Sequence, residues 1–221
     1  MKSINYMKNR ILNEKYKKDF LRKTRKLNLN ILDVGCGNDS PKLVNEYNPK
    51  LKYFGLDIDD YYISEESKKL CHRYTITTSS EFPQSILEFN IKFDYIICAH
   101  NLEHTEQPYI VFENILKVLN KNGEAYFSFP SALTKNFQSR KGTLNFFDDP
   151  THKEIINIDK LFEIIKNNNI SITYFSNSYR PFFRRILGYF RERKSKRINH
   201  VLNGTWAYYG FETIIWLKKN N

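Results

Sequence analysis

A short apolar segment that leads directly into two closely spaced glycines is the feature that most constrains how this chain can fold. Asn28–Val34 reads as a buried strand, and Gly35 and Gly37 follow it with one residue between them. Glycine has no Cβ atom, so the backbone can turn sharply there and a ligand can approach it closely. The helix predicted next, with Ser40 as its cap and Pro41 at its first position, would point free amide hydrogens at polar or anionic groups. The turn is therefore a candidate ligand site.

An acidic residue at the end of the next predicted strand supports this interpretation. Lys52–Asp57 reads as that strand, and Asp57 follows Gly37 by twenty residues. A carboxylate in this position can accept both hydroxyls of a ribose, as it does in dinucleotide-binding folds. A nicotinamide dinucleotide site would usually show a third glycine, in the pattern G-x-G-x-x-G, whereas Ser40 stands in that place. Pyrophosphate binding is therefore disfavoured.

Strands and helices alternate along the first part of the chain, which predicts a parallel sheet with helices on both faces. The last two strands show no clear helix between them and are expected to pair antiparallel at one edge. The predicted fold is α/β, doubly wound, with a mostly parallel sheet of about seven strands and an antiparallel edge strand. The further strands are predicted at Tyr74–Thr77, Phe93–Ala99, Glu124–Phe129, Ser171–Phe175 and Ala207–Leu217, and helices at Ser40–Tyr47, Ser64–Leu70, Pro108–Leu119 and Ile158–Lys166, with Asn120–Gly123 ending the third helix.

The chain is predicted to hold one domain behind a short N-terminal segment. Its 221 residues, of which 41% are apolar, suit a single α/β domain with a real core. Residues 1–28 form the N-terminal segment, in which Met7, Ile11, Tyr16, Phe20 and Leu27 recur at helical spacing. The domain proper is expected over residues 29–221, with insertions around 131–150 and 178–204.

Composition bounds the compartment and the partners. No apolar run approaches the roughly 20 residues that span a bilayer, and the charged N-terminus lacks the apolar centre of a signal peptide. Three widely spaced cysteines favour reduced thiols over disulfides or zinc, so a cytoplasmic location is expected. The net charge of +11 would attract anionic partners, but its spread along the chain favours a compositional bias toward Lys, Asn and Ile.

Four segments carry a resemblance to a known family. Asp33–Gly37 and Phe54–Ile58 resemble the first two motifs of the class I S-adenosylmethionine-dependent methyltransferases. Phe93–His104 is similar to the fourth motif of that family, and Ile115–Glu124 to the helix, turn and strand that follow it. The resemblance covers Ile31–Pro130; each motif alone is weak, whereas together they are specific.

The resemblance implies S-adenosylmethionine as the cofactor. The residues that it assigns to cofactor binding are Asp33, Gly35, Cys36, Gly37, Asp57, Ile58, Thr78, Ser79, His100 and Asn101. The family's loop after the third strand usually begins with an Asp that contacts the adenine amine, and Thr78 stands in that place here. A backbone amide or Ser79 could supply the contact instead.

Three histidines are candidates for the base that would help a hydroxyl acceptor lose its proton, an effect of about 10²–10⁴-fold. His100 and His104 follow the strongest strand, at the end of the sheet where ligands bind in such folds. His104, in Leu-Glu-His, resembles a recurrent family feature for which shaping the loop is the favoured role. His152 resembles part of a D-x-x-H stretch of small-molecule and saccharide methyltransferases, and is the preferred base or acceptor-positioning residue over a capping or packing role.

A metal site is not expected. Asp148, Asp149 and His152 offer oxygen and imidazole ligands that suit Mg²⁺ or Mn²⁺. They supply too few fixed ligands, however, and carboxylates before a helix are commonly caps.

The segment 179–197 has the most distinctive composition, with arginines among aromatic residues. As a helix it would place Phe183, Ile186, Leu187 and Phe190 on one face and the arginines on the other. Three roles stay open: peripheral contact with an anionic membrane, an RNA-binding patch, or a helix packed on the sheet edge with a solvated basic face.

The function predicted from these features is methyl transfer to a small-molecule or saccharide acceptor, at oxygen. A nucleic-acid methyltransferase is favoured only by charge, since no Asn-Pro-Pro-Tyr, Asp-Pro-Pro-Tyr or Pro-Cys follows the fourth strand. A cofactor-binding scaffold without activity is the alternative from another class; the intact Asp33, Gly35, Gly37 and Asp57 argue against it.

Overall fold

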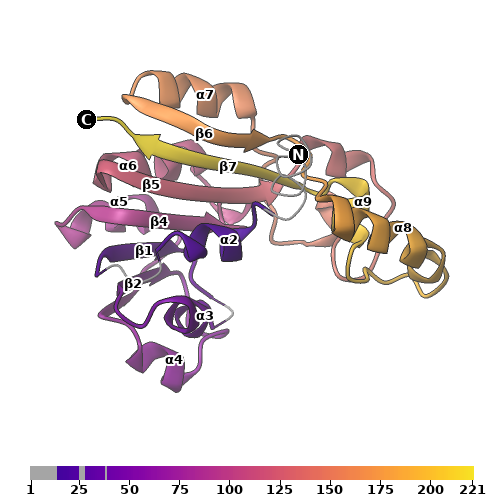
Figure 1. Cartoon of the computed structure of the whole chain (residues 1–221), viewed down its shortest axis with the longest axis horizontal. Coiled ribbons are helices and arrows are strands. Elements are labelled where there is room, and N and C mark those ends of the chain that lie inside the picture. Colours follow the sequence, from indigo (N-terminus) through magenta and orange to yellow (C-terminus); the bar gives the residue numbers. More distant parts are fainter. Residues whose placement is uncertain (1–13, 25–27, 38) are drawn as a thin grey trace, which may run out of the picture.

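Seven strands form one twisted sheet at the centre of the protein (Figure 1). The computed structural model describes residues 14–24, 28–37 and 39–221. Strand order is β3-β2-β1-β4-β5-β7-β6, and every pairing is parallel except those that β7 makes with β5 and β6. This confirms the predicted fold class. The strands are β1 (Asn30–Val34), β2 (Lys52–Asp57), β3 (Arg73–Ile76), β4 (Phe93–Ala99), β5 (Leu119–Pro130), β6 (Ile170–Ser176) and β7 (Glu212–Lys219).

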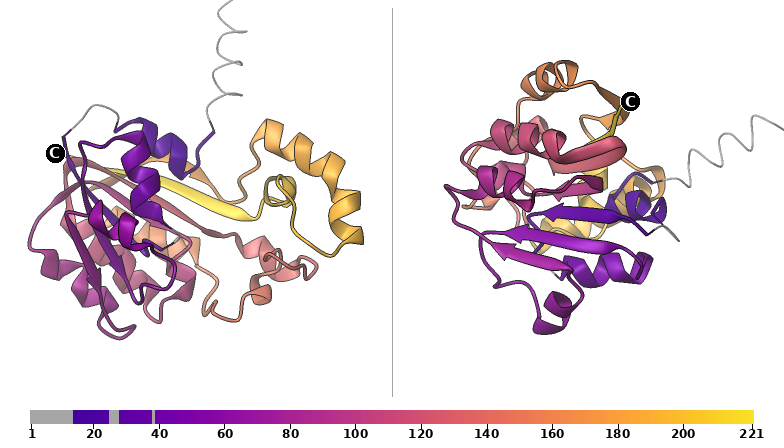
Figure 2. Two further views of the ribbon diagram at one scale, coloured as in Figure 1. Left: turned by 90° about the horizontal axis from the view of Figure 1, so that it is seen from below. Right: turned by 90° about the vertical axis from the view of Figure 1, so that its left-hand side faces the viewer.

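Helices cover both faces of the sheet (Figure 2). On one face lie α5 (Phe82–Ser85), α6 (Pro108–Val118) and α7 (Ile158–Lys166). On the other lie α2 (Lys17–Arg22) and α3 (Ser40–Tyr47). The remaining elements are α4 (Glu65–Lys69), α8 (Phe182–Arg197), α9 (Thr205–Tyr209) and four short 3-10 turns, η1 (Leu87–Phe89), η2 (Leu102–His104), η3 (Ala132–Asn136) and η4 (Phe146–Asp148).

The core on the α6 face is the larger of two apolar clusters. Phe112 and Ile115 of α6 are fully buried, and the ring of Phe112 packs 4.6 Å from that of Phe127 on β5. Leu161 and Ile165 of α7 extend the same cluster. Burial of each such side chain stabilises the fold by roughly 1.5–3 kcal/mol, which explains why helices with this spacing dock on a sheet.

The opposite face is closed by the N-terminal segment. Phe20 of α2 is fully buried, with its ring 5.5 Å from Tyr95, 5.7 Å from Tyr126 and 5.5 Å from Trp216. The predicted helix over Met7–Leu27 is thus observed in part, because Met7, Ile11 and Leu27 lie outside the described residues. The predicted division into residues 1–28 and 29–221 stays a prediction.

The predicted bounds Ser40–Tyr47 match those of α3, but the cap assigned to Ser40 and the helix end assigned to Asn120–Gly123 are wrong. Asp39, with φ 52°, precedes α3 as its N-cap, and Ser40 is the first helical residue. The Ser40 hydroxyl donates to the buried carboxylate of Asp33 instead of capping the helix. Strand β5 begins at Leu119, so Asn120–Gly123 lies inside the strand, where its pairing with β4 shifts register.

The last predicted strand is also placed wrongly. Residues 205–209 form α9, and Gly210, with φ +72°, ends that helix before β7 begins at Glu212. The aromatic ring of Trp206 stacks on Phe211, with centroids 4.3 Å apart. An apolar run that periodicity assigns to one strand is therefore divided between a helix and a strand by a left-handed glycine.

The segments predicted as insertions pack against each other beyond the carboxyl ends of the parallel strands (Figure 1). The Arg140 guanidinium, 1% exposed, donates two hydrogen bonds to Glu192 of α8. The indole of Trp206 donates to the carbonyl of Thr143 at 2.7 Å. A long helix, α8, thus joins β6 to β7, contrary to the expectation of a connection without one. Across the described residues, no helix combines the length and the apolar character needed to cross a bilayer.

Candidate active site

The glycine turn lies at the centre of the sheet, where the strand order reverses. Strand β1 has β2 on one side and β4 on the other, so ligands are expected outside the carboxyl ends of these strands. Gly35 has φ +75°, and its amide donates to the carbonyl of Leu56 at 2.8 Å. The side chain of Asn101, from the loop after β4, occupies the place where any side chain at residue 35 would project. Gly35 is therefore required by the fold itself.

Gly37 has a different reason to be glycine. A Cβ atom there would lie 3.6 Å from Oδ2 of Asp57 and 3.8 Å from Cβ of Tyr62, both ordinary contacts. The described residues thus leave room for a side chain, and the missing side chain keeps the space in front of the Asp57 carboxylate clear. A cradle of this shape fits a ribose whose hydroxyls donate to the carboxylate.

Asp57 is held at the end of β2 with its carboxylate toward this space. Oδ1 accepts a hydrogen bond from the amide of Ile58 at 2.8 Å. Burial raises the pKa of Asp57, and the hydrogen bond from Ile58 only partly opposes that rise. Three side chains nearby in sequence are exposed and apolar, namely Ile58, Tyr61 and Tyr62. They form a rim against which a planar base could pack.

The loop after β3 brings Thr78 and Ser79 to the same edge, since the amide of Thr77 donates to the carbonyl of Asp57. Both side chains are exposed. The Thr78 hydroxyl donates to Glu81 at 2.8 Å and accepts from the Glu81 amide at 3.3 Å. Thr78 thus stabilises the start of the following turn.

Two residues of the first motif are turned away from the open space. Asp33 is 0% exposed, and its Oδ2 accepts from Lys17 at 3.0 Å, from Tyr53 at 2.9 Å and from Ser40. Cys36 is also buried, and burial raises the pKa of its thiol strongly. Asp33 therefore anchors Lys17 of α2, and Cys36 packs in the apolar cluster on this face of the sheet.

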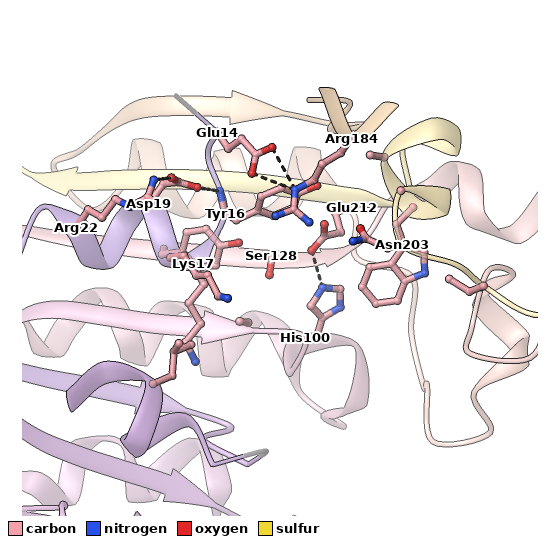
Figure 3. Close-up of a pocket in the computed structure, with 18 of the residues that line it drawn as sticks. Glu14, Tyr16, Lys17, Asp19, Arg22, His100, Ser128, Arg184, Asn203 and Glu212 are labelled. Carbon is pink, nitrogen blue, oxygen red and sulfur yellow. Dashed lines mark hydrogen bonds and ion pairs between the residues drawn. The ribbon is translucent and has the colours of Figure 1, made fainter. Parts of the chain in front are cut away.

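A cavity of about 570 Å³ opens at the carboxyl ends of β4 and β5 (Figure 3). Its walls come mostly from three parts of the chain that lie far apart in sequence, namely the N-terminal segment, the ends of β4 and β5, and the region from α8 to β7, with one residue from α3. The lining residues are Glu14, Tyr16, Lys17, Lys18, Asp19, Arg22, Leu43, Ala99, His100, Tyr126, Ser128, Arg184, Val201, Leu202, Asn203, Gly204, Trp206, Ala207 and Glu212. Of these lining residues, the sequence motifs predict only His100 as a site residue. The basic and aromatic composition of residues 179–197 identifies that segment as unusual but does not predict that Arg184 lines a cavity.

His100 lies in the wall of the cavity between two carboxylates. Its Nε2 lies 2.8 Å from Glu212 (Figure 3). Its Nδ1 lies 3.2 Å from Glu103. Burial alone would lower the pKa of His100, but these hydrogen bonds outweigh it and raise that pKa to about 10. His100 is therefore an imidazolium at neutral pH and cannot serve as the base.

His104 and His152 come together although 48 positions separate them, with ring centroids 4.8 Å apart. Nδ1 of His104 is hydrogen-bonded to the hydroxyl of Thr151 at 2.9 Å. Nδ1 of His152 lies 2.6 Å from the carbonyl oxygen of Phe146. Neither ring lines the cavity. Glu103 links this pair to the cavity wall, because it is hydrogen-bonded to His100 and its carboxylate lies within 4.8 Å of both rings' ligand atoms.

Asp148 and Asp149 have local roles. Oδ2 of Asp148 accepts from the amides of Arg140, Leu144 and Asn145, which closes the loop before η4. Asp149 accepts from the amide and the hydroxyl of Thr151. The expectation that carboxylates here cap the backbone is confirmed for both.

Comparison with known proteins decides the family. Residues 7–174 match the family described as methyltransferase domain, which is more than half of the chain. The chain belongs to this family. The resemblance to class I methyltransferases, read from Asp33–Gly37 and Phe54–Ile58, is thereby confirmed.

Relatives of known sequence or structure agree with the fold. An uncharacterized protein of Methanocaldococcus jannaschii, MJ0906, is 30% identical over 123 residues, which are 53% of this chain and 33% of that protein. The chain thus matches about a third of the length of that relative. A SAM dependent methyltransferase from Archaeoglobus fulgidus superposes with a TM-score of 0.52 at 16% identity, covering 98% of this chain and 99% of that one. The plantazolicin methyltransferase BamL, solved with SAH, gives 0.58 at 15% identity, covering 92% and 83%.

Proposed function

We propose that this chain transfers a methyl group from S-adenosylmethionine to a hydroxyl of a small-molecule or saccharide acceptor. The observation that carries the proposal is the placement of the Asp57 carboxylate, at the end of β2, against a glycine turn at the end of β1, on the same edge of the sheet as a cavity of about 570 Å³. The carboxylate would bind the ribose of a nucleoside cofactor, and the cavity would hold the acceptor. Membership in the methyltransferase domain family supports the same reaction.

The cofactor would be held mainly by backbone and by one carboxylate. Asp57 would accept the ribose hydroxyls, while the glycine turn of Gly35, Cys36 and Gly37 would let the cofactor approach the backbone closely. Ile58, 49% exposed, would pack against the adenine, with Thr78 and Ser79 at its edge. His100 and Asn101, after β4, would lie by the amino-acid end, and Asp33 would act through Lys17, which it holds in the cavity wall.

The lining of the cavity suits an acceptor rich in hydroxyls. Tyr16, Tyr126 and Trp206 supply flat apolar surface, and Lys17 and Glu212 supply charged hydrogen-bonding groups. Such a combination of apolar walls with a few convergent polar groups binds and orients small ligands. Sugars present both an apolar ring face and hydroxyls, which favours a saccharide.

When bound, S-adenosylmethionine supplies an electrophilic methyl group on a sulfonium. The protein's part is to hold the acceptor oxygen in line with that methyl group and to exclude water. For the acceptor's proton we propose His152 and His104, because His100 is already protonated at neutral pH. Neither ring lines the cavity, so this role requires an acceptor that extends past His100 and Glu103, and it applies to the chain with no metal ion at these rings. His152 donates from Nδ1 to a carbonyl, which leaves Nε2 as its basic atom.

Calorimetric titration with S-adenosylmethionine tests the cofactor site. The substitution Asp57→Ala removes a charge-assisted acceptor, so affinity should fall about 10–100-fold. The matched control is Asp59→Ala, which removes the same charge two residues away in an exposed position. Equal affinity in the two variants would refute the role of Asp57. Loss of binding with a nicotinamide dinucleotide bound instead would refute the proposed function.

We also propose a peripheral contact with anionic membrane through residues 179–197. Helix α8 buries Gly188, Glu192 and Ser195, so its polar side faces the protein. Of the predicted apolar face, Phe183, Ile186 and Phe190 are exposed and Leu187 is half-buried, which disfavours a helix packed by that face on the sheet edge. The exposed apolar side chains are Phe182, Phe183, Ile186, Tyr189 and Phe190, at 54%, 54%, 40%, 64% and 75%. Arginine and lysine side chains flank them, as in helices that lie in a lipid interface.

Co-sedimentation with anionic vesicles tests this contact. Binding is expected for the native chain, with a marked loss in Phe190→Ser and no loss in Phe147→Ser, a control that is 73% exposed outside α8. Binding to RNA without binding to vesicles would overturn the proposal. A cytoplasmic location stays a prediction from composition.

A further inference from the structure

Three side chains that can bind a metal ion converge beside the cavity wall. Each of the three offers one ligand atom, and these atoms lie within 4.8 Å of one another; the residues are Glu103, His104 and His152. Two backbone hydrogen bonds hold the segments together, because the amides of Lys153 and Glu154 donate to the carbonyl of Glu103. The arrangement therefore belongs to the fold and does not depend on long flexible side chains.

Hydrogen bonds fix both imidazoles in the same tautomer. Nδ1 of His152 faces the carbonyl of Phe146, which can only accept, so this nitrogen carries the proton. The hydroxyl of Thr151 donates to Asp149 and must therefore accept from Nδ1 of His104. Each ring is left with a lone pair on Nε2. Histidines that bind metal ions are oriented in this way, with the other ring nitrogen donating to a carbonyl or a similar partner.

Glu103 contributes a buried carboxylate oxygen that lacks a partner. The residue is 0% exposed, and its Oε1 is hydrogen-bonded to His100. Among the described residues, nothing donates to its Oε2. An unpaired buried carboxylate oxygen is unfavourable unless a cation or a donor meets it.

We propose that Glu103, His104 and His152 bind one divalent transition-metal ion. Two imidazole nitrogens and one carboxylate are a ligand set that suits Zn²⁺, Fe²⁺ and Mn²⁺. Oδ2 of Asp149 lies 3.9 Å from Nε2 of His152 and is placed to become a fourth ligand. Metal–ligand distances of about 2.0–2.2 Å require the ligand atoms to close in by roughly 1 Å.

This site differs from the one considered from the sequence. Asp148 is excluded, because three backbone amides occupy its carboxylate. Glu103 and His104 replace it, and only the fold brings them to His152. The inference does not depend on the proposed methyl transfer. It does bear on the base, since a nitrogen that binds a metal ion cannot also accept a proton.

Calorimetry with Zn²⁺ and, separately, Mn²⁺ tests the site, using tag-free full-length protein freed of metal by a chelator. One ion per chain is expected for at least one of the two metals. His104→Gln and His152→Gln should each weaken binding at least tenfold. His72→Gln and His200→Gln are matched controls, because both histidines are exposed and outside the cluster, and should leave binding unchanged.

A milder variant guards against loss of the fold. Thr151 is exposed, so Thr151→Val should keep the thermal midpoint while weakening binding about tenfold through the orientation of His104. Absence of binding by both ions, or binding equal to that of the native chain in both cluster variants, would overturn the inference. Asp57→Ala should lose S-adenosylmethionine and retain the metal ion, so that failure of one proposal is distinguished from failure of the other.

Discussion

At the scale of single residues, the site combines side chains that a ligand requires with others that the fold requires. Gly35 is fixed by its positive φ and by Asn101, whereas Gly37 is explained by the space that it leaves before Asp57. Motif spacing finds both glycines but cannot separate these roles, because the distinction depends on atoms brought in from the loop after β4. The same holds for His100, whose charge is set by Glu103 and by the distant Glu212.

The raised pKa of Asp57 predicts how cofactor affinity depends on pH. Burial raises that pKa, so on acidification the carboxylate becomes protonated earlier than an ordinary Asp. A neutral acid is a weaker acceptor for ribose hydroxyls, so on acidification the affinity for S-adenosylmethionine should begin to fall at a higher pH than it would with an ordinary Asp. Titrations at a series of pH values measure this. The Asp57→Asn variant should show a flatter profile over the same range, and a flat profile in the native chain would contradict the assignment.

At the scale of elements, the sequence predicts correctly the bounds of several strands and helices that polar residues flank. The predictions for Lys52–Asp57, Phe93–Ala99 and Ile158–Lys166 coincide with β2, β4 and α7. Helix α8 shows the limit: its periodicity identifies which residues share a face, but not which face is buried. Here Gly188 of α8 lies against the backbone of Gly204. This close contact requires that α8 pack through the side that carries Gly188, which is its polar side.

The buried ion pair between α8 and the loop before η4 predicts a measurable stability difference. Glu192→Ala would leave the guanidinium of Arg140 buried without its partner, at a cost of about 3–5 kcal/mol. Lys196→Ala removes an exposed partner of the same carboxylate and should cost less than about 1 kcal/mol. Urea unfolding followed by tryptophan fluorescence measures both. Similar losses in the free energy of unfolding for the two variants would show that burial of the Arg140 guanidinium does not require the Glu192 carboxylate.

At the scale of the whole molecule, the cavity belongs to no single segment. The glycine turn and its acid lie in the first half of the chain and were found by spacing. The walls from Tyr16, Lys17, Arg184 and Glu212 were not, because they meet only after the N-terminal segment and the last strand dock on the central sheet. Hydrophobic periodicity describes how an element is buried, and it carries little information on which distant elements become neighbours.

Docking of the N-terminal segment should make a large contribution to stability. Phe20→Ala removes a fully buried ring from between Tyr95, Tyr126 and Trp216, and should cost about 3–5 kcal/mol. The same truncation at the exposed Phe147 should cost less than about 0.5 kcal/mol. Equilibrium unfolding in urea compares them. A cost at Phe20 as small as that at Phe147 would mean that α2 does not hold this face of the sheet.

The cavity wall and the glycine turn are built by different parts of the chain, so substitutions can change one without changing the other. Residues 33–79 build the cradle at the glycine turn, whereas residues 14–22 and 184–212 supply most of the wall opposite it. Mutations in the second group can reshape the chamber while the first stays intact. Related chains with this architecture can therefore change the acceptor that they recognise while the residues proposed to bind the cofactor stay the same.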